Sequence, residues 1–180
     1  MKGIVFTEFS EMVEEKFGEE MLDNIIEDSE LASGGSYTAI GTYDHTEILQ
    51  LVTSLSAATN IEVPKLVFAF GGHLYTFFYS HYPMFFQAAT NSFDFLESVE
   101  NHIHVEVRKL YPDAELPSFD CRRIDPTQFE MIYRSSRPFA DVAEGLITAC
   151  CRHYNETITI QRDDVNDAHG HGVRFLLTKQ

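Results

Sequence analysis

The chain has 180 residues, 44% of them hydrophobic and 13% aromatic, with 15 Phe and no Trp. This length predicts one domain, residues 1–180, whose core is large enough to enclose a cofactor. Lys and Arg total 13 against 28 Asp and Glu, so the net charge is -15. That charge argues against nucleic acid and anionic membranes as partners, because their phosphates would repel the protein.

The ends of the chain and its cysteines favour a cytoplasmic protein. Glutamates interrupt the apolar residues of the first 17 positions, which is not the pattern of a signal peptide. No apolar run is long enough to span a bilayer. There are three cysteines, an odd number that includes the adjacent pair Cys150 and Cys151, and this does not predict a secreted disulfide framework.

The first half of the chain predicts helices. Apolar residues at helical spacing predict one helix that ends at Phe17 and a short second helix over 21–26. Glycines at 34, 35 and 41 predict a loop over 33–43. Asp44 is suited to cap a third helix, with Glu47 placed three residues later to complete a capping box. Pro64 suits the first turn of a fourth helix, which is apolar on nearly every side and is therefore expected to be buried.

The second half predicts one more long helix and then a sheet. The helix runs from about Phe93 to Tyr111 and is ended by Pro112. Beyond Pro117, strands are expected over 118–123 and 129–133, followed by a helix over 139–154 and strands over 157–161 and 173–178. The fold class is therefore α+β, with a helical N-terminal part packed on a C-terminal antiparallel sheet that carries one helix.

The long helix places a histidine where it could bind a cofactor. At about 100° per residue, an apolar stripe runs along one side of this helix, formed by Leu96, Val99, Ile103, Val107 and Leu110. His104 lies at the edge of this stripe, and His102 falls on the polar side. From the periodicity alone, His104 could be an axial heme ligand or an ordinary, partly buried histidine.

A wider pattern decides between these two readings. His104 is followed by Tyr111-Pro112 at the helix end, by Pro117 thirteen residues on, and by the run Tyr133-Arg134-Ser135-Ser136-Arg137. These three features, in this order, resemble the heme nitric oxide/oxygen-binding (H-NOX) family, which includes the heme domain of soluble guanylate cyclase. The resemblance spans essentially the whole chain and fits the bacterial stand-alone type.

The resemblance implies that heme b lies between the helical part and the sheet, with His104 as the proximal iron ligand. It implies that Tyr133, Ser135 and Arg137 hold the heme propionates, and that Pro117 presses on the heme. Alternation along a strand puts the three polar side chains on one face, where two hydroxyls and a guanidinium can bind carboxylates. Without the resemblance, Arg137 would be read as a surface ion-pair residue and Pro117 as a simple break between helix and strand.

The distal side of the heme determines which gas binds. Oxygen-binding members of the family have a tyrosine there, and the matching position in this chain is Val142. The other residues that the resemblance places on or near this side also lack a donor: Val5, Phe9, Leu74, Phe78 and Leu146. We therefore expect nitric oxide as the ligand, carbon monoxide as a second gas, and little or no oxygen complex. His73 and Tyr75 are the nearest candidate donors.

The output is expected to lie in another protein. No kinase or cyclase sequence follows within the 180 residues, and relatives act on a histidine kinase or a cyclic-di-GMP enzyme, either a diguanylate cyclase or a phosphodiesterase. The protein is therefore expected to be a sensor and not an enzyme. Two alternatives stay open, a heme-free module that binds small apolar molecules and a peroxidase-like heme enzyme, although the latter needs a distal acid-base residue.

Two weaker features have ordinary explanations. One loop gathers five potential metal ligands: Asp163, Asp164, Asp167, His169 and His171. No cysteine accompanies them at zinc-ligand spacing, so a solvated hairpin is the preferred interpretation. Cys150 and Cys151 are consecutive on a helix and are interpreted as packing residues, and nothing near Cys121 marks its thiol as activated.

Overall fold

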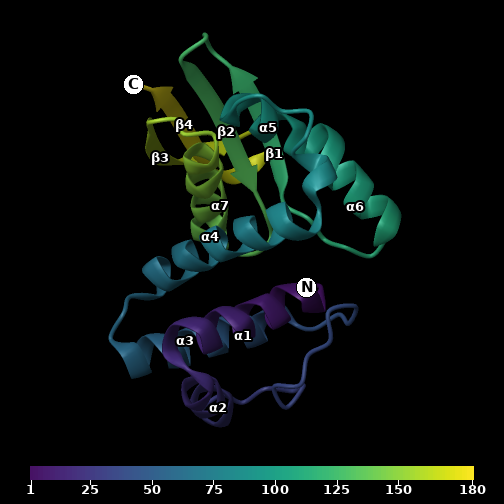
Figure 1. Ribbon diagram of the computed structural model, residues 1–180, viewed down its shortest axis with the longest axis vertical. Coiled ribbons are helices and arrows are strands. Elements are labelled where there is room, and N and C mark those ends of the chain that lie inside the picture. The colour runs from purple at the N-terminus through teal and green to yellow at the C-terminus, as the bar shows by residue number, and fades with distance from the viewer.

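The computed structural model describes residues 1–180, and one helix, α4, joins its two lobes (Figure 1). The N-terminal lobe contains α1 (Gly3–Phe17), α2 (Glu19–Glu27) and α3 (His45–Thr59), followed by α4 (Val63–His81) and the short 3-10 helix η1 (Pro83–Phe85). The helices of the second lobe are α5 (Ser92–Ser98), the π-helical segment η2 (Val99–Ile103), α6 (His104–Leu110) and α7 (Ala140–His153). None of these helices is long and apolar enough to cross a membrane.

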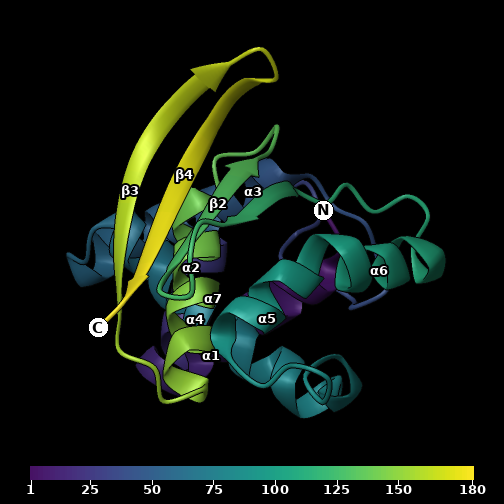
Figure 2. The ribbon, with the colours of Figure 1, turned by 90° about the horizontal axis from the view of Figure 1, so that it is seen from above.

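The strands of the second lobe are β1 (Ser118–Arg123), β2 (Gln128–Arg134), β3 (Ile158–Asp167) and β4 (Gly170–Lys179). They form one antiparallel sheet in the order β1-β2-β4-β3. Alternate residues of β2 are buried, and Met131 pairs in register with the fully buried Phe175 of β4. Figure 2 shows α7 beside this sheet, and the β3–β4 hairpin extends beyond it as a long arm. The α+β architecture predicted from the sequence is confirmed.

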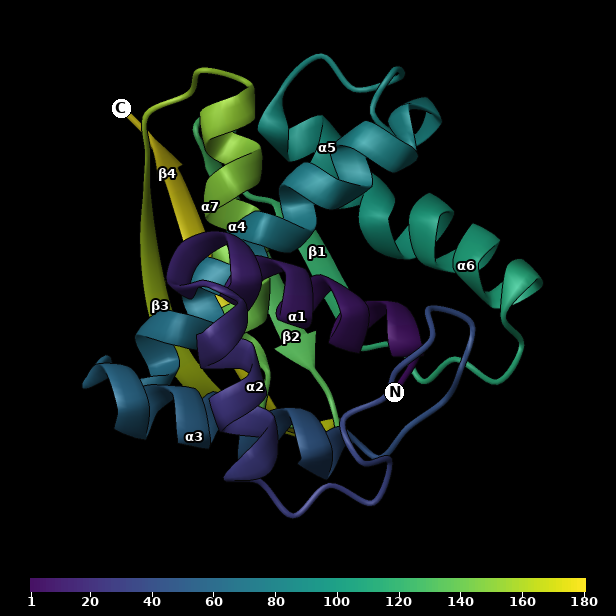
Figure 3. The same ribbon diagram turned by 60° about the horizontal axis from the view of Figure 1, so that its bottom comes forward.

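Each lobe has its own hydrophobic core. In the N-terminal lobe, side chains of α1, α3 and α4 meet around the fully buried Phe6, Phe9, Leu51 and Leu55. In the second lobe, α5 and α7 pack their apolar faces against β2 and β4. Figure 3, seen from below, shows α1, α2 and α3 gathered beneath α4, while the sheet and α7 lie behind them. Phe78 of α4 and Leu146 of α7 pack against both cores and so lie at the junction of the lobes.

Two glycines allow α4 and α7 to cross closely. A Cβ atom built on Gly145 would lie 2.1 Å from the carbonyl oxygen of Phe68, and one on Gly71 would lie 2.3 Å from that of Val142. Since carbon and oxygen cannot approach so closely, any side chain at either position would push the helices apart. The junction between the lobes thus depends on the absence of these two side chains.

The start of α3 differs in one detail from the prediction. Asp44 caps the helix as expected, and its side chain accepts a hydrogen bond from the backbone N–H of Thr46 at 2.9 Å. Glu47 does not complete a capping box. Its carboxylate instead accepts hydrogen bonds from the hydroxyls of Ser33 at 2.5 Å and Tyr37 at 2.9 Å, so it anchors the preceding loop.

The last hairpin is longer than predicted. The strands were expected to end at 161 and to resume at 173, but ladder pairing continues to Asp167 and Gly170. Polar residues in this arm mask the strand pattern because both of its faces are largely exposed. Gly170, with φ at 98°, closes the turn in a conformation that L-residues rarely adopt.

Candidate functional site

A cavity of about 460 Å³ lies between the lobes, and 32 of its 38 lining residues are hydrophobic. Its volume falls within the range of about 300–1,000 Å³ typical of cofactor sites. The apolar stripe predicted on the long helix lines it in full, with Leu96, Val99, Ile103, Val107 and Leu110 all contributing. The lining suits a large apolar group that carries few polar substituents.

His104 faces this cavity from the first residue of α6. Its side chain is 12% exposed, and burial lowers the pKa of its imidazole below the usual value despite the opposing effect of Glu100. The ring is therefore neutral at pH 7, which is the form that binds a metal. Nδ1 lies 2.9 Å from a carboxylate oxygen of Glu100, and Nε2 makes no hydrogen bond. One nitrogen is thus held by the protein while the other keeps its lone pair for a ligand bond.

Glu100 was not identified from the sequence, and it organises the surroundings of His104. Its carboxylate accepts hydrogen bonds from Arg108 at 3.0 Å and from the backbone N–H of Phe119 at 3.2 Å. Burial alone would raise the pKa of Glu100, but Arg108, His104 and the Phe119 N–H together hold it below its usual value. The i, i+4 spacing of Glu100 and His104 on one helix was the available signal.

The long helix is not uniform, and this also differs from the prediction. Residues Val99–Ile103 form a π-helical turn, in which the N–H of His104 donates to the carbonyl of Val99 five residues earlier. Such turns are rare and occur often at functional sites. Here the turn lies immediately before His104 and contains Glu100.

Tyr133, Ser135 and Arg137 all line the same cavity. They do not share one strand, as strand alternation predicted, because β2 ends at Arg134 and Ser135 and Arg137 lie in the segment that follows it. The Ser135 hydroxyl accepts a hydrogen bond from the backbone N–H of Arg137 at 3.1 Å, and the Tyr133 hydroxyl donates to the Arg137 carbonyl at 3.4 Å. The guanidinium of Arg137, 13% exposed, pairs with the carboxylate of Glu115. Because it already holds one carboxylate at the cavity, this guanidinium has the position and charge to hold another.

The opposite wall is apolar. Val5, Leu74, Phe78, Val142 and Leu146 line the cavity as expected. Phe9 does not. It is fully buried in the N-terminal core, where its ring packs edge-to-face on Phe70 at 5.4 Å. Phe9 lies one helical turn beyond Val5 on α1. Val5 lines the cavity, whereas Phe9 is far enough along the helix to pack inside the lobe.

The two candidate distal donors differ in position. His73 does not line the cavity and binds Glu8 on α1 instead. Tyr75 does line it, but its ring packs against Phe86 and Phe95, and its buried hydroxyl has no hydrogen-bond partner. Burial, with Cys150 nearby, raises the pKa of Tyr75 far above its usual value.

Pro117 lines the cavity beside Leu116 and Phe119, at the start of β1. Its position fits both interpretations made from the sequence, a break before a strand and a contact with the bound group. Phe119 lies next to His104, with ring centroids 5.8 Å apart. The proximal wall is therefore built from α6, the segment before β1, and β1 itself.

The remaining candidates lie outside this cavity. The acidic residues and histidines between 163 and 171 lie along the exposed β3–β4 arm and its turn, which agrees with a solvated hairpin. Cys150 and Cys151 are buried in the core of the second lobe. Burial raises the pKa of Cys121 to about 12 and that of Cys151 to about 11, so these thiols are protonated at neutral pH.

The chemistry of the lining fits a heme. It combines one neutral imidazole with a free nitrogen, a large apolar space, and hydroxyl and guanidinium groups near one end. An iron porphyrin needs an axial nitrogen ligand, apolar faces and partners for two propionates. The residues present supply all three.

Comparison with known proteins agrees with this assignment. The family model described as Haem-NO-binding matches residues 2–162. The unliganded Fe(II) H-NOX protein from K. algicida is 42% identical, with a TM-score of 0.92 over 100% of this chain and 97% of that chain. The IWP-051-bound H-NOX from Shewanella woodyi in the Fe(II)CO state is also 42% identical, with a TM-score of 0.84 over 100% and 95% of the two chains.

A more distant structure shares the fold. The H-NOX protein from S. oneidensis in the Fe(II)NO state is 23% identical and has a TM-score of 0.90 over 100% of this chain and 99% of that chain. No curated protein sequence matches the chain. Taken with the cavity and the inward-facing histidine, the family match shows that the chain belongs to the H-NOX family of heme-based gas sensors.

Proposed function

We propose that this protein is a nitric oxide sensor that holds ferrous heme b in its interlobe cavity with His104 as the axial ligand. One observation carries the proposal: His104 faces a largely apolar cavity with Nδ1 engaged by Glu100 and Nε2 free. Bound heme would supply the iron at which the gas binds. The hydrogen bond at Nδ1 fixes the ring orientation and increases the basicity of Nε2, as carboxylates hydrogen-bonded to metal-binding histidines do in other metal sites.

The propionates would be held by Tyr133, Ser135 and Arg137. The guanidinium of Arg137 is the only positive charge among the three, and it already lies next to a carboxylate. A planar guanidinium can bind a carboxylate through two parallel hydrogen bonds, which a lysine cannot. Glu115 would then share Arg137 with a propionate or release it.

The preference for nitric oxide over oxygen rests on the apolar distal wall. Val5, Leu74, Phe78 and Val142 offer no donor, so a bound dioxygen with partial negative charge would gain no hydrogen bond there. Nitric oxide and carbon monoxide do not depend on such a bond. The Shewanella woodyi relative, solved in the Fe(II)CO state, supports carbon monoxide as a second ligand.

The signal would pass through the proximal elements. Glu100 ties His104 to Arg108 on α6 and to the backbone of β1, so a change in the pull on His104 would reach both elements. Since each lobe has its own core, the response open to the molecule is a rotation of one lobe against the other. We propose that a histidine kinase or a cyclic-di-GMP enzyme binds the two arrangements with different affinity.

Gas titration tests the selectivity. The Soret band of the reduced protein is recorded under nitrogen, air, carbon monoxide and nitric oxide. The proposal predicts a shift with nitric oxide and with carbon monoxide, and no stable complex in air. A stable oxygen complex would be consistent with the heme site but would contradict the proposal that the distal wall offers no hydrogen-bond donor. For the output, unliganded and nitric oxide-loaded protein must differ in their effect on the kinase or cyclic-di-GMP enzyme.

A further inference from the structure

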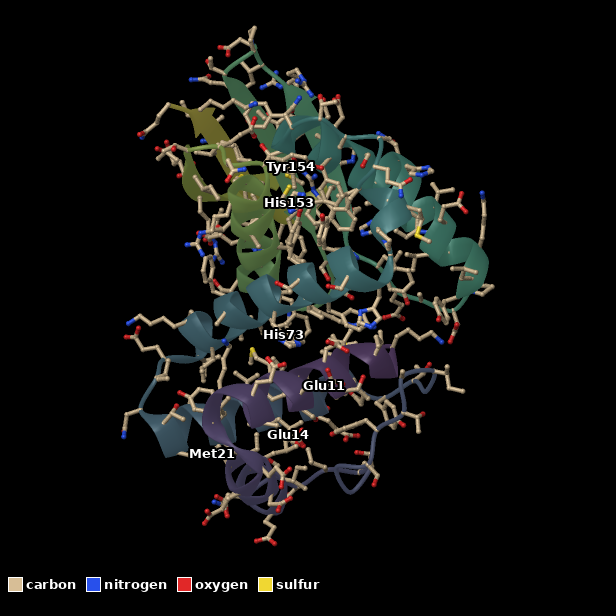
Figure 4. All side chains as sticks on the ribbon, in the orientation of Figure 1. Glu11, Glu14, Met21, His73, His153 and Tyr154 are labelled. Atoms are coloured by element: carbon tan, nitrogen blue, oxygen red, sulfur yellow. The ribbon has the colours of Figure 1, made fainter.

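Three potential metal ligands meet between α1 and α4, outside the heme cavity. Glu8 and Glu11 of α1 and His73 of α4 each offer one ligand atom, and these atoms lie within 4.8 Å of one another. Figure 4 shows His73 on the side of α4 that faces α1, with Glu11 on the opposing helix. None of the three residues lines the cavity. The cluster is therefore separate from the site described above.

Glu8 is an unusual residue for the interface between two helices. Its side chain is only 3% exposed, and its one hydrogen-bonding contact is with Nε2 of His73 at 3.1 Å. No other residue forms a hydrogen bond or ion pair with this carboxylate. A buried carboxylate is costly unless a cation or several donors compensate for the water it has lost.

His73 is surrounded by carboxylates on both sides of its ring. Nε2 faces Glu8, and Nδ1 lies 3.9 Å from a carboxylate oxygen of Glu15. Positions 8, 11 and 15 follow the i, i+3, i+7 spacing of one helix face, so all three carboxylates point the same way. Histidines that bind metals usually donate their second ring N–H to such a carboxylate. The arrangement thus contains three potential metal ligands and a further carboxylate, Glu15, near the other ring nitrogen of His73.

We propose that Glu8, Glu11 and His73 bind a divalent transition metal, best matched by Zn²⁺, with Glu15 orienting the imidazole. Zinc accepts imidazole nitrogen and carboxylate oxygen ligands, and water can complete a tetrahedral site. Calcium and magnesium are poorer matches because they prefer oxygen ligands alone. The metal would tie α1 to α4 next to Leu74, which lines the heme cavity. This inference does not depend on which gas the heme binds.

The test is calorimetric titration of Zn²⁺ alone into the heme-loaded full chain, with retained zinc counted by mass spectrometry after desalting. Wild type is expected to bind one equivalent. Glu11→Gln and His73→Gln are expected to weaken binding at least about tenfold. Glu11 is exposed, so its replacement leaves folding intact. Glu14→Gln, on the same helix but outside the cluster, is the matched control and should bind as wild type does.

A second control removes the two histidines of the hairpin arm, which lie near several acidic residues and could take up zinc. The double variant His169→Ala/His171→Ala alters only the exposed hairpin arm and should retain the one equivalent. The proposal is overturned if wild type retains no zinc, if Glu11→Gln binds as tightly as wild type, or if the hairpin variant loses the binding.

Discussion

The carboxylate of Glu100 lies 2.9 Å from Nδ1 of His104, one helical turn away along the same helix. This contact fixes which ring nitrogen faces the heme cavity. Arg108 and the backbone N–H of Phe119 bind the same carboxylate, so the orientation of His104 is set by groups from both α6 and β1. The proximal site is therefore a small network, and each of its members can be tested.

Replacing Glu100 with Gln should weaken the bond between His104 and the heme iron. A neutral amide is a weaker hydrogen-bond acceptor than a carboxylate, so it polarises the Nδ1–H bond less. Nε2 then donates less electron density to the iron. We expect a lower iron–histidine stretching frequency in the resonance Raman spectrum. We also expect heme loss to be about 10-fold faster, because replacing a carboxylate that hydrogen-bonds to a metal-binding histidine typically lowers metal affinity by about 10–100-fold. Glu106→Gln is the control, because this partly exposed carboxylate of α6 pairs with Lys109 and not with His104. Unchanged spectra in Glu100→Gln would mean that the contact plays no electronic role.

Arg137→Ala should increase the rate of heme transfer to apomyoglobin, because the propionates lose their one guanidinium partner. Arg137→Lys should recover only part of the affinity, since lysine lacks the planar pair of donors. Arg122→Ala removes a mostly exposed arginine of β1, outside the cavity lining, and should leave the rate unchanged. Equal heme retention in Arg137→Ala and Arg122→Ala would argue against propionate binding by Arg137.

Val142→Tyr should create an oxygen complex that wild type lacks. The new hydroxyl would lie on the distal wall and could donate to bound dioxygen. Val142→Phe adds the same ring without the hydroxyl and should bind no oxygen. Absorption spectra in air distinguish the variants. An oxygen complex in wild type that disappears in Tyr75→Phe would instead identify Tyr75 as the distal donor.

Gly145→Ala should destabilise the junction between the lobes. The added methyl group would collide with the Phe68 carbonyl, and overpacking of this kind costs about 1–3 kcal/mol. Gly72→Ala is the control: Gly72 lies on α4, the helix against which Gly145 packs, and nothing lies within 4 Å of its Cβ position. The control should gain about 0.5–1 kcal/mol from reduced backbone entropy. Urea denaturation measures both changes. If Gly145→Ala is as stable as wild type, the α4–α7 contact tolerates a methyl group.

The stability of the second lobe should depend on pH through Glu156. Its carboxylate accepts hydrogen bonds from the backbone N–H of Ser92 at 3.1 Å and from Lys179 at 2.7 Å. Burial alone would raise the pKa of Glu156, but Lys179 and Ser92 outweigh it and hold the pKa below the usual 4.5. The contribution is therefore present above pH 4.5 and is lost as the pH falls through the folded value.

Glu156→Gln should accordingly cost about 1.5–3 kcal/mol of unfolding free energy at pH 7, as expected for hydrogen bonds to a charged group. The difference from wild type should shrink as the pH falls below 4.5. Glu20→Gln, on the exposed side of α2, should change little at either pH. A difference that stays constant from pH 7 to pH 3 would exclude ionisation of Glu156 as its cause.

The sequence predicted the fold well where local signals agree with tertiary packing. Asp44, Pro64 and the apolar stripe beside His104 mark helices that the structure confirms. The β3–β4 arm was underestimated because its polar residues carry no burial pattern. The π-helical turn before His104 was also missed, since a shift from i−4 to i−5 hydrogen bonding leaves no trace in composition.

The candidate site shows a similar division. Residues inside a recognisable motif, such as Tyr133 and Arg137, were found from the motif and do line the cavity. Phe9 lies in the core of the N-terminal lobe, one helical turn from Val5, which lines the cavity. Glu100 was missed because a carboxylate four residues from a histidine is common on solvated helices, and only the buried geometry distinguishes this pair.

The most direct test of the account is the spectrum of the reduced protein with and without the His104 side chain. Wild type should show a five-coordinate ferrous heme. His104→Gly should lose or perturb the Soret band, and added imidazole should restore it by filling the space left in the cavity. An unchanged heme spectrum in His104→Gly, with no response to imidazole, would contradict the assignment of His104 as the axial ligand.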